Sequence, residues 1–362
     1  MMIQVKNNWL FLFLLIFPVI SAAQEGIKES VINEIQDNDR DLRHRLDEIE
    51  KSLDDLLWYH KVGDMAHVDK VYMYGPPKWK EQNPTAQGAG NPVKFWSYVF
   101  IPKSIDPAGK YPLVVLPHGG VHSNFSTYYT HIIRELMAQQ YIVVAAEYRG
   151  STGYGRSHFE KIDYGGLETE DVHASRDFMI GNYSIVDEKR VGIIGWSHGG
   201  LIALMNIFDH PDDYQVAFAG VPVSDLIARM GYKTQAYRDL FSGDYHIGQT
   251  AYENVEEYRK RSPAWNARKY DGTPLLIHSN TNDEDVNVLE VEHLIKSLKE
   301  TGKDFQYEIF QDVPGGHSFD RMDTKEAREI RVKIYKFLGI HLNPPYLIDS
   351  VEKLEQAAYR FP

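Results

Sequence analysis

The sequence VGIIGWSHGG at residues 191–200 decides the fold of this chain. Its first half is a short apolar run rich in β-branched residues, which predicts a buried strand. A Gly-x-Ser-x-Gly motif follows directly, and the apolar residues 201–207 after it predict a helix. Strand, sharp turn and helix are the context of a nucleophile elbow, in which Gly195 and Gly199 keep side chains out of a crowded turn. We therefore predict that Ser197 is a nucleophile.

The composition is that of an ordinary globular protein, with 362 residues of which 43% are hydrophobic and 25% charged. This length accommodates one large α/β domain with an appendage, or two small domains. The chain has no cysteine, which excludes disulfides, thiolate nucleophiles and cysteine-ligated zinc. The formal net charge is −12 and no Lys/Arg run occurs, which argues against binding nucleic acid or an anionic membrane, because phosphate neutralisation needs clustered cations.

Residues 1–23 have the organisation of a secretory signal peptide. Lys6 is their only charge, the run 9–20 is apolar and interrupted only by Pro18, and the small residues 21–23 (SAA) form a cleavage site. The apolar run is too short to span a bilayer comfortably, so a membrane anchor is the less favoured interpretation. We expect cleavage, and a periplasmic or secreted protein with no stable membrane insertion.

Residues 24–65 are predicted to form a separate helical arm. Apolar residues recur along it at alternating spacings of four and three, and charged residues fill the remainder, which predicts one amphipathic helix with a narrow apolar stripe. The stripe has two interpretations: a short coiled coil that joins copies into a homo-oligomer, or a helix that packs the stripe on its own globular domain. We favour the second. The stripe consists of Leu42, Leu46, Ile49, Leu53 and Leu56, with Ile35 one heptad earlier.

A globular domain is predicted over residues 66–342, with 343–362 as a C-terminal tail. Over most of it, short apolar strands alternate with helical stretches, which predicts an α/β fold with a mostly parallel central sheet and helices on both faces. Residues 93–101 alternate like a further strand, whereas 61–92 contain turn and loop signals. Residues 225–261 are long for a connection, and we expect a lid or cap there. The predicted apolar strands are 113–116, 142–146, 191–194, 216–219, 275–278 and 307–310.

A serine nucleophile needs a general base, and His317 is the candidate. In the α/β-hydrolase arrangement the chain order is serine, then acid, then histidine. His317 follows the predicted strand 307–310 on a glycine-rich loop. Such a loop can carry an imidazole over the edge of the sheet where Ser197 is expected.

The acid that orients this base is predicted in the loop after the strand 275–278. Three carboxylates occur together there, in the sequence DED at 283–285. We assign the acid to Asp283, with Asp285 and Glu284 as the alternatives.

The oxyanion donors are predicted to be backbone N–H groups. One is the N–H of His198, directly after the nucleophile. The ring of His198 cannot easily reach the serine hydroxyl, because adjacent residues of the elbow point in different directions. The second donor is Gly119 or Gly120, in the motif LPHGG at 116–120, where bare backbone can approach a developing charge. This chemistry needs no cofactor, and no metal-binding motif such as His-Glu-x-x-His is present.

These motifs together resemble the catalytic domain of the prolyl oligopeptidase family, in its acylaminoacyl-peptidase and dipeptidyl-peptidase branch. The resemblance extends over residues 93–340 and implies an α/β-hydrolase fold and a Ser-Asp-His triad at Ser197, Asp283 and His317. It is carried by LPHGG at 116–120, YRGSTGYG at 148–155 and GWSHGG at 195–200, and supported in order by GG at 165–166, EDV at 170–172 and the late histidine.

Three departures from the family pattern bear on the substrate. Family peptidases place a β-propeller before this domain, and residues 24–92 are too few for one. The residue after the nucleophile is commonly Tyr and lines the specificity pocket, whereas here it is His198. The acid loop holds one extra residue relative to the family pattern, so counting from either end places the acid at Asn282 or at Asp283, and we follow the carboxylate.

The sequence therefore predicts an exported serine hydrolase that works through an acyl-enzyme. We favour an ester substrate, a small-molecule ester or an acylated glycan, because similar domains without a propeller are often esterases. A serine exo- or oligopeptidase acting on a short peptide is the alternative. A non-catalytic binding module is disfavoured, because all the candidate residues of the triad are intact.

Overall fold

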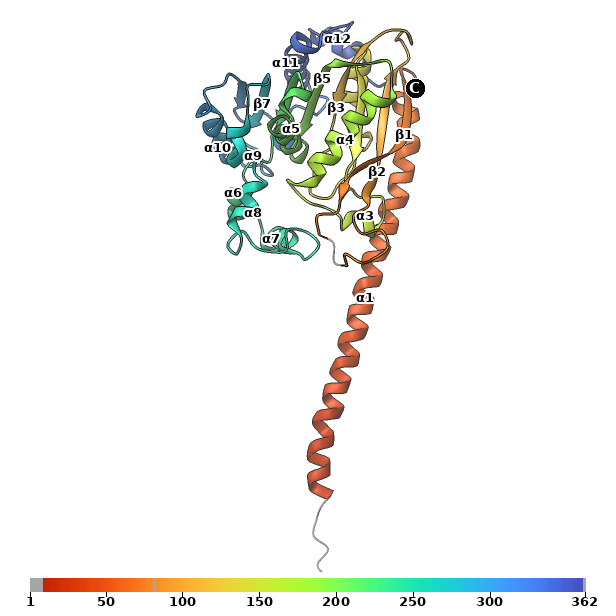
Figure 1. Ribbon diagram of the computed structural model, residues 1–362, viewed down its shortest axis with the longest axis vertical. Helices are drawn as coiled ribbons and strands as arrows, with labels where there is room; N and C mark the ends of the chain where they lie inside the picture. The colour runs from red at the N-terminus through yellow and green to blue at the C-terminus, as the bar shows by residue number, and fades with distance from the viewer. Residues whose placement is uncertain (1–8, 81–82, 361–362) are drawn as a thin grey trace, which may run out of the picture.

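The computed structural model describes residues 9–80 and 83–360, with side chains from residue 28 onward (Figure 1). The described residues form one eight-stranded sheet, in the order β1-β2-β4-β3-β5-β6-β7-β8. β2 is antiparallel to both β1 and β4, and all the other neighbouring strands are parallel. The predicted α/β fold with a mostly parallel sheet is thus confirmed. The strands are β1 (Ala66–Pro77), β2 (Pro92–Pro102), β3 (Tyr111–Val115), β4 (Ile142–Glu147), β5 (Val186–Trp196), β6 (Val216–Gly220), β7 (Leu275–Asn280) and β8 (Gln306–Phe310).

The six apolar strands of the sequence analysis are β3 to β8, and the strand predicted at 93–101 is β2. The sequence showed turn and loop signals in 61–92 and no strand, yet the first part of this range forms β1. This strand lies at the edge of the sheet, and many of its side chains are exposed or only half-buried, so the sequence lacks a clear apolar pattern. Gly75 and the two prolines after it fall at its end, where the register with β2 shifts and proline is tolerated.

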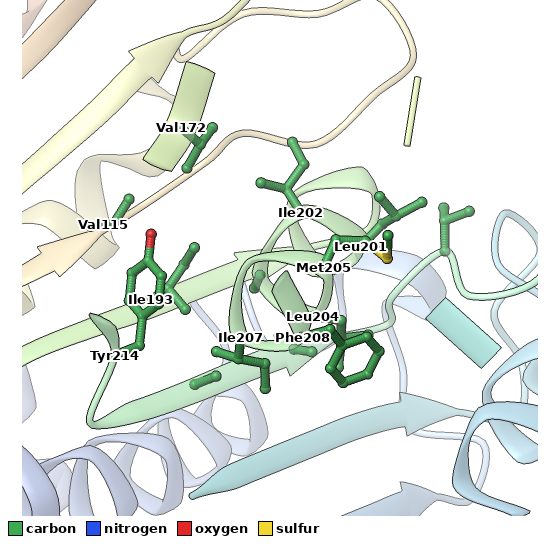
Figure 2. Close-up of a cluster of buried hydrophobic side chains, with 14 of the residues drawn as sticks. Val115, Val172, Ile193, Leu201, Ile202, Leu204, Met205, Ile207, Phe208 and Tyr214 are labelled. Atoms are coloured by element: carbon green, nitrogen blue, oxygen red, sulfur yellow. The ribbon is translucent and has the colours of Figure 1, made fainter. Parts of the chain in front are cut away.

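Helices cover both faces of the sheet, and successive strand residues point to opposite faces. Ile193 of β5 belongs to the cluster that includes Leu201 of α5, whereas the next residue, Ile194, packs with Leu338 of α11 in the other cluster. Figure 2 shows the first cluster, with the apolar side chains of α5 gathered against the sheet. One face is covered by α4 (Leu167–Asn182), α5 (His198–Asp209) and α10 (Val288–Lys299), and the other by α2 (Thr130–Ala138) and α11 (Lys325–Leu342).

The remaining elements are short and lie in the connections. The segment 225–261, where we expect a lid or cap, contains three helices between β6 and β7. In the predicted tail, a short helix packs on α11, with Leu354 buried. These elements are α3 (Arg156–Phe159), α6 (Leu226–Tyr232), α7 (Gln235–Ser242), α8 (Val255–Lys260), α9 (Pro263–Asn266), α12 (Val351–Gln356) and the 3₁₀ turns η1 (Thr127–Tyr129), η2 (Pro211–Asp213), η3 (Ala267–Lys269) and η4 (Gly316–Ser318).

The N-terminal helix α1 (Trp9–Val62) is continuous and extends far beyond the globular domain (Figure 1). Part of the predicted signal peptide, residues 1–8, lies outside the described residues, and the rest of it belongs to α1. Among the helices from residue 28 onward, where the structure describes side chains, none combines the length and apolarity needed to cross a membrane.

The C-terminal part of α1 docks on the globular domain through its polar and aromatic side. Trp58 and Val62 are fully buried, and the Trp58 ring stacks on Phe125 with centroids 5.5 Å apart. The Nζ of Lys51, itself only 3% exposed, forms an ion pair of 2.7 Å with Glu147 at the end of β4. The helix is thus held by a buried charge pair and an aromatic contact.

The favoured interpretation of the apolar stripe, packing on its own domain, is wrong. The stripe lies on the other side of α1 from the docked residues, and each of its members is between 52% and 68% exposed. A stripe shows that a helix has an apolar face, but the docking energy here comes from the opposite face. We call this surface the outer stripe; it consists of Ile35, Leu42, Leu46, Ile49, Leu53 and Leu56.

We expect Trp58→Ala to destabilise the protein by about 3–5 kcal/mol, the cost of a large cavity in a packed core. Tyr59→Ala is the matched control, because the neighbouring side chain is 60% exposed and should change the free energy of unfolding by less than about 0.5 kcal/mol. Urea unfolding followed by circular dichroism measures both. Equal effects of the two substitutions would contradict the docking of α1 described above.

Candidate active site

Ser197 occupies the sharp turn between β5 and α5. Its backbone has φ 59° and ψ −123°, a conformation that non-glycine residues rarely adopt and that costs free energy. The flanking glycines are required by space: a Cβ on Gly195 would lie 2.1 Å from the carbonyl oxygen of Gly199, and a Cβ on Gly199 would lie 2.4 Å from that of Pro117. The predicted nucleophile therefore sits on a strained elbow, with a side chain that is buried apart from a small exposed part.

His317 and Asp283 lie in contact on neighbouring loops, after β8 and β7. The Nδ1 of His317 is 2.7 Å from Oδ2 of Asp283. The other carboxylate oxygen, Oδ1, accepts the backbone N–H groups of Asp285 and Val286 at 2.8 and 2.9 Å. Because Asp283 is locked on both oxygens, it fixes the imidazole as the tautomer protonated on Nδ1 and leaves Nε2 as the acceptor.

The loop of His317 is also tied to the elbow itself. The indole N–H of Trp196, the residue before the nucleophile, donates to Asp320 at 2.7 Å. Asp320 is fully buried and follows His317 by three residues. Burial raises the pKa of Asp320, and the positive charge of Arg321 opposes this effect. This bond holds the base loop beside the strand that delivers Ser197.

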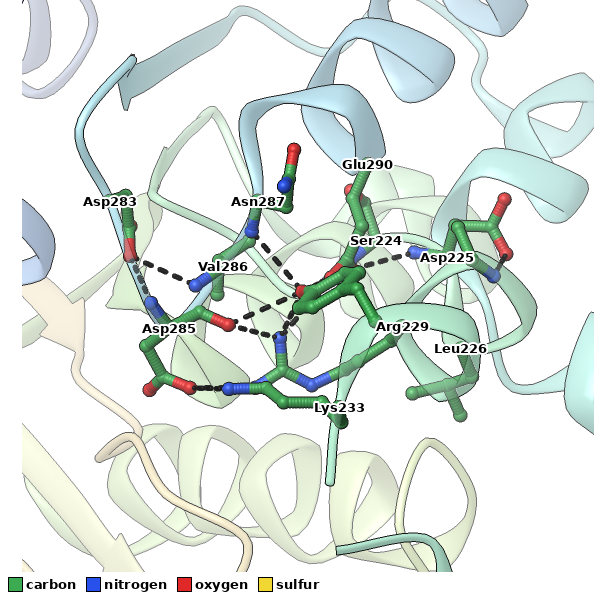
Figure 3. A network of polar contacts seen from close by, with 12 residues as sticks. Ser224, Asp225, Leu226, Arg229, Lys233, Asp283, Asp285, Val286, Asn287 and Glu290 are labelled. Atoms are coloured by element: carbon green, nitrogen blue, oxygen red, sulfur yellow. Dashed lines mark hydrogen bonds and ion pairs between the residues drawn. The ribbon is translucent and has the colours of Figure 1, made fainter. Parts of the chain in front are cut away.

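Asp285, the alternative acid, is bound by cations instead. Its Oδ1 is held by the Nζ of Lys233 at 2.5 Å and by Arg229 at 3.1 Å (Figure 3). Its Oδ2 is 3.6 Å from Nε2 of His317. Burial raises the pKa of Asp285, but the hydrogen bond from Lys233 and the charge of Arg229 outweigh it and lower the pKa below its usual value. The structure thus brings Asp283, rather than Asp285, to Nδ1, while Glu284 is exposed.

Arg229 of α6 was not singled out from the sequence, yet it anchors the acid loop. Its guanidinium donates to the backbone oxygen of Asp285 at 2.9 Å and to the buried carboxylate of Glu290 at 3.2 Å. Glu290 in turn accepts the backbone N–H of Ser224 at 3.1 Å, close to the start of α6 (Figure 3). The segment expected to be a lid is therefore part of the support for Asp283. No local sequence signal joins residues so far apart along the chain.

The ring of His198 is engaged on both nitrogens and does not serve as a second base. Nε2 lies 2.9 Å from Glu168 and Nδ1 lies 2.9 Å from the backbone oxygen of Gly120. The ring stacks on Tyr164 at 3.8 Å between centroids and is fully buried. The backbone N–H of His198 stands at the start of α5, where N–H groups have no intrahelical acceptor. This geometry is compatible with the prediction that the backbone N–H of His198 is an oxyanion donor and that its ring is not the general base.

The candidate donors in the LPHGG loop lie beside the nucleophile. A Cβ on Gly119 would lie 3.0 Å from the backbone oxygen of Trp196 and 3.3 Å from the Cβ of Ser197, so a side chain there would be crowded, and Gly120 has a φ of 90° that favours glycine. The N–H of Gly119 donates to the hydroxyl of Tyr129 at 3.3 Å. Tyr129 was not singled out from the sequence. His118 supports this loop: its Nε2 lies 2.9 Å from Ser151, and burial lowers its pKa to about 4, so the ring is neutral.

One group of side chains in the described part of the chain has the spacing of metal ligands: Glu170, His173 and His210. It lies on α4 and at the C-terminal end of α5, roughly 18 Å along that helix from Ser197 at 1.5 Å per residue. Each histidine already has a carboxylate partner, His210 with Glu170 at 3.0 Å and His173 with Asp213 at 2.8 Å. The group is separate from the triad, and a mechanism without metal or cofactor stays a prediction.

Comparisons with known proteins identify the family and the relatives that this chain resembles. The family model described as "Prolyl oligopeptidase family" matches residues 127–344. A Bacillus subtilis protein named "Uncharacterized peptidase YuxL" is 31% identical over 63% of this chain and 34% of its own length. Human dipeptidyl peptidase 8 is 30% identical over 66% of this chain and 26% of its own length. The chain thus spans about a third or less of these curated relatives.

Solved structures agree on the fold. The acylaminoacyl peptidase of Pyrococcus horikoshii superimposes with a TM-score of 0.64 at 19% identity, covering 80% of this chain and 44% of that one. A puromycin-hydrolyzing peptidase of Mycobacterium tuberculosis gives a TM-score of 0.62 at 24% identity, over 78% and 40% of the two chains. At these identities the likeness establishes the α/β-hydrolase fold alone.

We expect Asp283→Asn to lower kcat by about 10⁴-fold, because the wrong tautomer of His317 is then favoured. Asp285→Asn is the matched control and should cost far less, since Asp285 contacts Lys233 and Arg229 rather than Nδ1. Ser197→Ala gives the lowest activity expected, because loss of the nucleophile lowers kcat by about 10⁶-fold.

Hydrolysis of an activated aryl ester by the three purified variants measures these effects, and fluorophosphonate labelling shows whether Ser197 still reacts. If Asp285→Asn is the more damaging change, the acid is Asp285 and the assignment must be exchanged.

Proposed function

The chain belongs to the prolyl oligopeptidase family, and on that basis we propose that this serine hydrolase is a peptidase that cleaves short peptides through an acyl-enzyme. The observation that carries the proposal is the Asp283–His317 contact of 2.7 Å, with Asp283 locked by two backbone N–H groups, on a base loop that Asp320 ties to the strained serine elbow. The matched relatives are named as peptidases, so they favour the peptidase alternative of the sequence analysis over an esterase.

In the proposed mechanism Ser197 Oγ attacks the carbonyl carbon while its proton passes to Nε2 of His317. The oxyanion that forms is stabilised by the N–H of His198 and by an N–H of Gly119 or Gly120, each such donor contributing about 10²–10³ in kcat. His317 then gives the proton to the leaving amine, the C–N bond breaks, and the acyl group stays on Ser197. Water, deprotonated by the same imidazole, releases the acid and restores the serine.

A cavity of about 560 Å³ beside the base supports peptides over long-chain esters. Its lining includes His317, the amide of Asn282, three charged side chains and two glycines, and no aliphatic side chain. Such a surface suits the amide and charged groups of a peptide, whereas a long acyl chain requires an apolar pocket. The charged residues of the lining are Lys233, Glu284 and Asp285.

The named relatives suggest how the peptide is cut. One group is named dipeptidyl peptidase, and an Arabidopsis thaliana relative is named acylamino-acid-releasing enzyme. Both names describe the removal of a small unit from a peptide, so we propose an exopeptidase. The free or acylated state of the peptide N-terminus distinguishes these two relatives, and both kinds of substrate belong in the assay below.

We further propose that the protein is exported to the periplasm or the medium. The support is the signal-peptide organisation of residues 1–23. Edman sequencing of protein recovered outside the cytoplasm should begin at Gln24. An N-terminus at residue 1 or 2 on the mature protein would contradict export by cleavage.

The peptidase proposal predicts the ratio of kcat/KM for an aryl ester to that for the matching aminoacyl-anilide. This ratio should be no larger than that of an authentic family peptidase measured on the same two substrates, because both enzymes must protonate a poor amine leaving group. Anilides with free and with acylated amino groups are assayed side by side. A ratio that exceeds the reference by about 10³, or about 4 kcal/mol, would restore the esterase interpretation.

A further inference from the structure

The outer stripe of α1 is a long apolar surface that its own domain leaves uncovered. Ile32, 43% exposed, continues the stripe toward the N-terminus. Monomeric proteins expose single apolar residues often, but a contiguous row of this kind marks an interaction site. The stripe starts after residue 23, so the proposed cleavage of the leader leaves it intact.

The residues of the stripe occupy the a and d positions of a heptad repeat, the spacing of a coiled coil. The a positions are 32, 39, 46 and 53, and the d positions are 35, 42, 49 and 56. Every position is Ile or Leu except Asp39. In a parallel coil the Asp39 side chains of the two copies meet, which costs stability, and the ion pair of 2.9 Å between Asp39 and Arg43 of the same helix offsets part of this repulsion.

The geometry of docking leaves the outer stripe open to a second helix. Lys51 and Trp58, which hold α1 to the domain, are on the side opposite the stripe: Ile49 and Lys51 are roughly 160° apart around a helix of 3.6 residues per turn. The Lys51–Glu147 pair and the buried Trp58 fix this orientation. A partner helix on the stripe therefore meets no part of the globular domain that carries it.

Charge complementarity identifies the partner as a second copy in parallel orientation. In a parallel coil, Arg45 of one copy lies beside Glu50 of the other, and the symmetry repeats this attraction. In the antiparallel register that places residue 39 opposite residue 49, Arg43 would face Arg43 and Arg45 would face Arg45. Both Arg45 and Glu50 are exposed, so they are accessible for such a contact.

The apolar area of the outer stripe and Ile32 is also large enough for a specific dimer interface. Burying seven half-exposed Ile and Leu side chains on each of two copies removes on the order of 1,000 Å² or more from water, which approaches the size of a specific interface. We propose that two copies of this chain associate through the outer stripe and Ile32 as a parallel, two-stranded coiled coil. The two globular domains then lie on opposite outer sides of the coil, each docked through its own Lys51 and Trp58.

Light scattering coupled to gel filtration tests the assembly on the full protein as recovered from the expressing cell. We expect twice the monomer mass for the wild type and the monomer mass for Ile49→Lys. Ile340→Lys on α11 is the matched control, because Ile340 is 75% exposed but lies outside the stripe, and it should remain a dimer. A monomeric wild type, a trimer or tetramer, or a dimeric Ile49→Lys would overturn the proposal.

Orientation is tested by a single cysteine, since the chain has none. Asp39→Cys should form a disulfide-linked dimer on mild oxidation in a parallel coil, where position 39 meets position 39. In an antiparallel coil it faces position 49, so only the double variant Asp39→Cys/Ile49→Cys would cross-link, which would contradict the proposal. Tyr59→Cys, on an exposed side chain outside the stripe, should not cross-link.

Hydrolysis of the activated ester should be unchanged in Ile49→Lys, because the stripe is remote from the triad. The assembly is thus tested independently of the proposed peptidase function.

Discussion

The positive φ angle of Ser197 is the constraint on which the rest of the site depends. A serine in this conformation is strained, and only the surrounding structure can hold it there. Bare backbone at Gly195 and Gly199 makes the turn possible, and the strand order of the sheet then sets its neighbours. Because β7 and β8 follow β5 and β6 in that order, the loops after them deliver Asp283 and His317 to the same edge of the sheet.

Buried polar contacts around the elbow convert this topology into a fixed geometry. Glu168 accepts the N–H groups of Gly165 and Gly166 and holds the ring of His198, and both of these side chains are fully buried. Burying charge is costly unless every group is paired, so such contacts contribute more to precise placement than to stability. The ring of His198, held by Glu168, is fully buried directly after the nucleophile.

The long helix α1 combines two surfaces with different physical character. One side is bound to the globular domain by Lys51 and Trp58, and the other presents the outer stripe to solvent. Lys51 on the bound side pairs with Glu147, and the other carboxylate oxygen of Glu147 lies 3.5 Å from Nε2 of His118, so the arm is linked to the loop beside the nucleophile. Assembly through the stripe would therefore position the catalytic domain without covering its triad.

The sequence by itself determined the elbow, the positions of β2 to β8 along the chain and the triad candidates, because each is written in a local pattern: apolar runs, glycines at a turn, and a histidine or carboxylate directly after a strand. Tertiary structure alone decided the features that depend on distant residues. It placed Asp283 rather than Asp285 at Nδ1 of His317, formed β1 at the edge of the sheet, and joined His198 to Glu168. It also decided which face of α1 is covered, because a periodic pattern shows that a helix has two faces, whereas the partner each face meets is set by long-range packing.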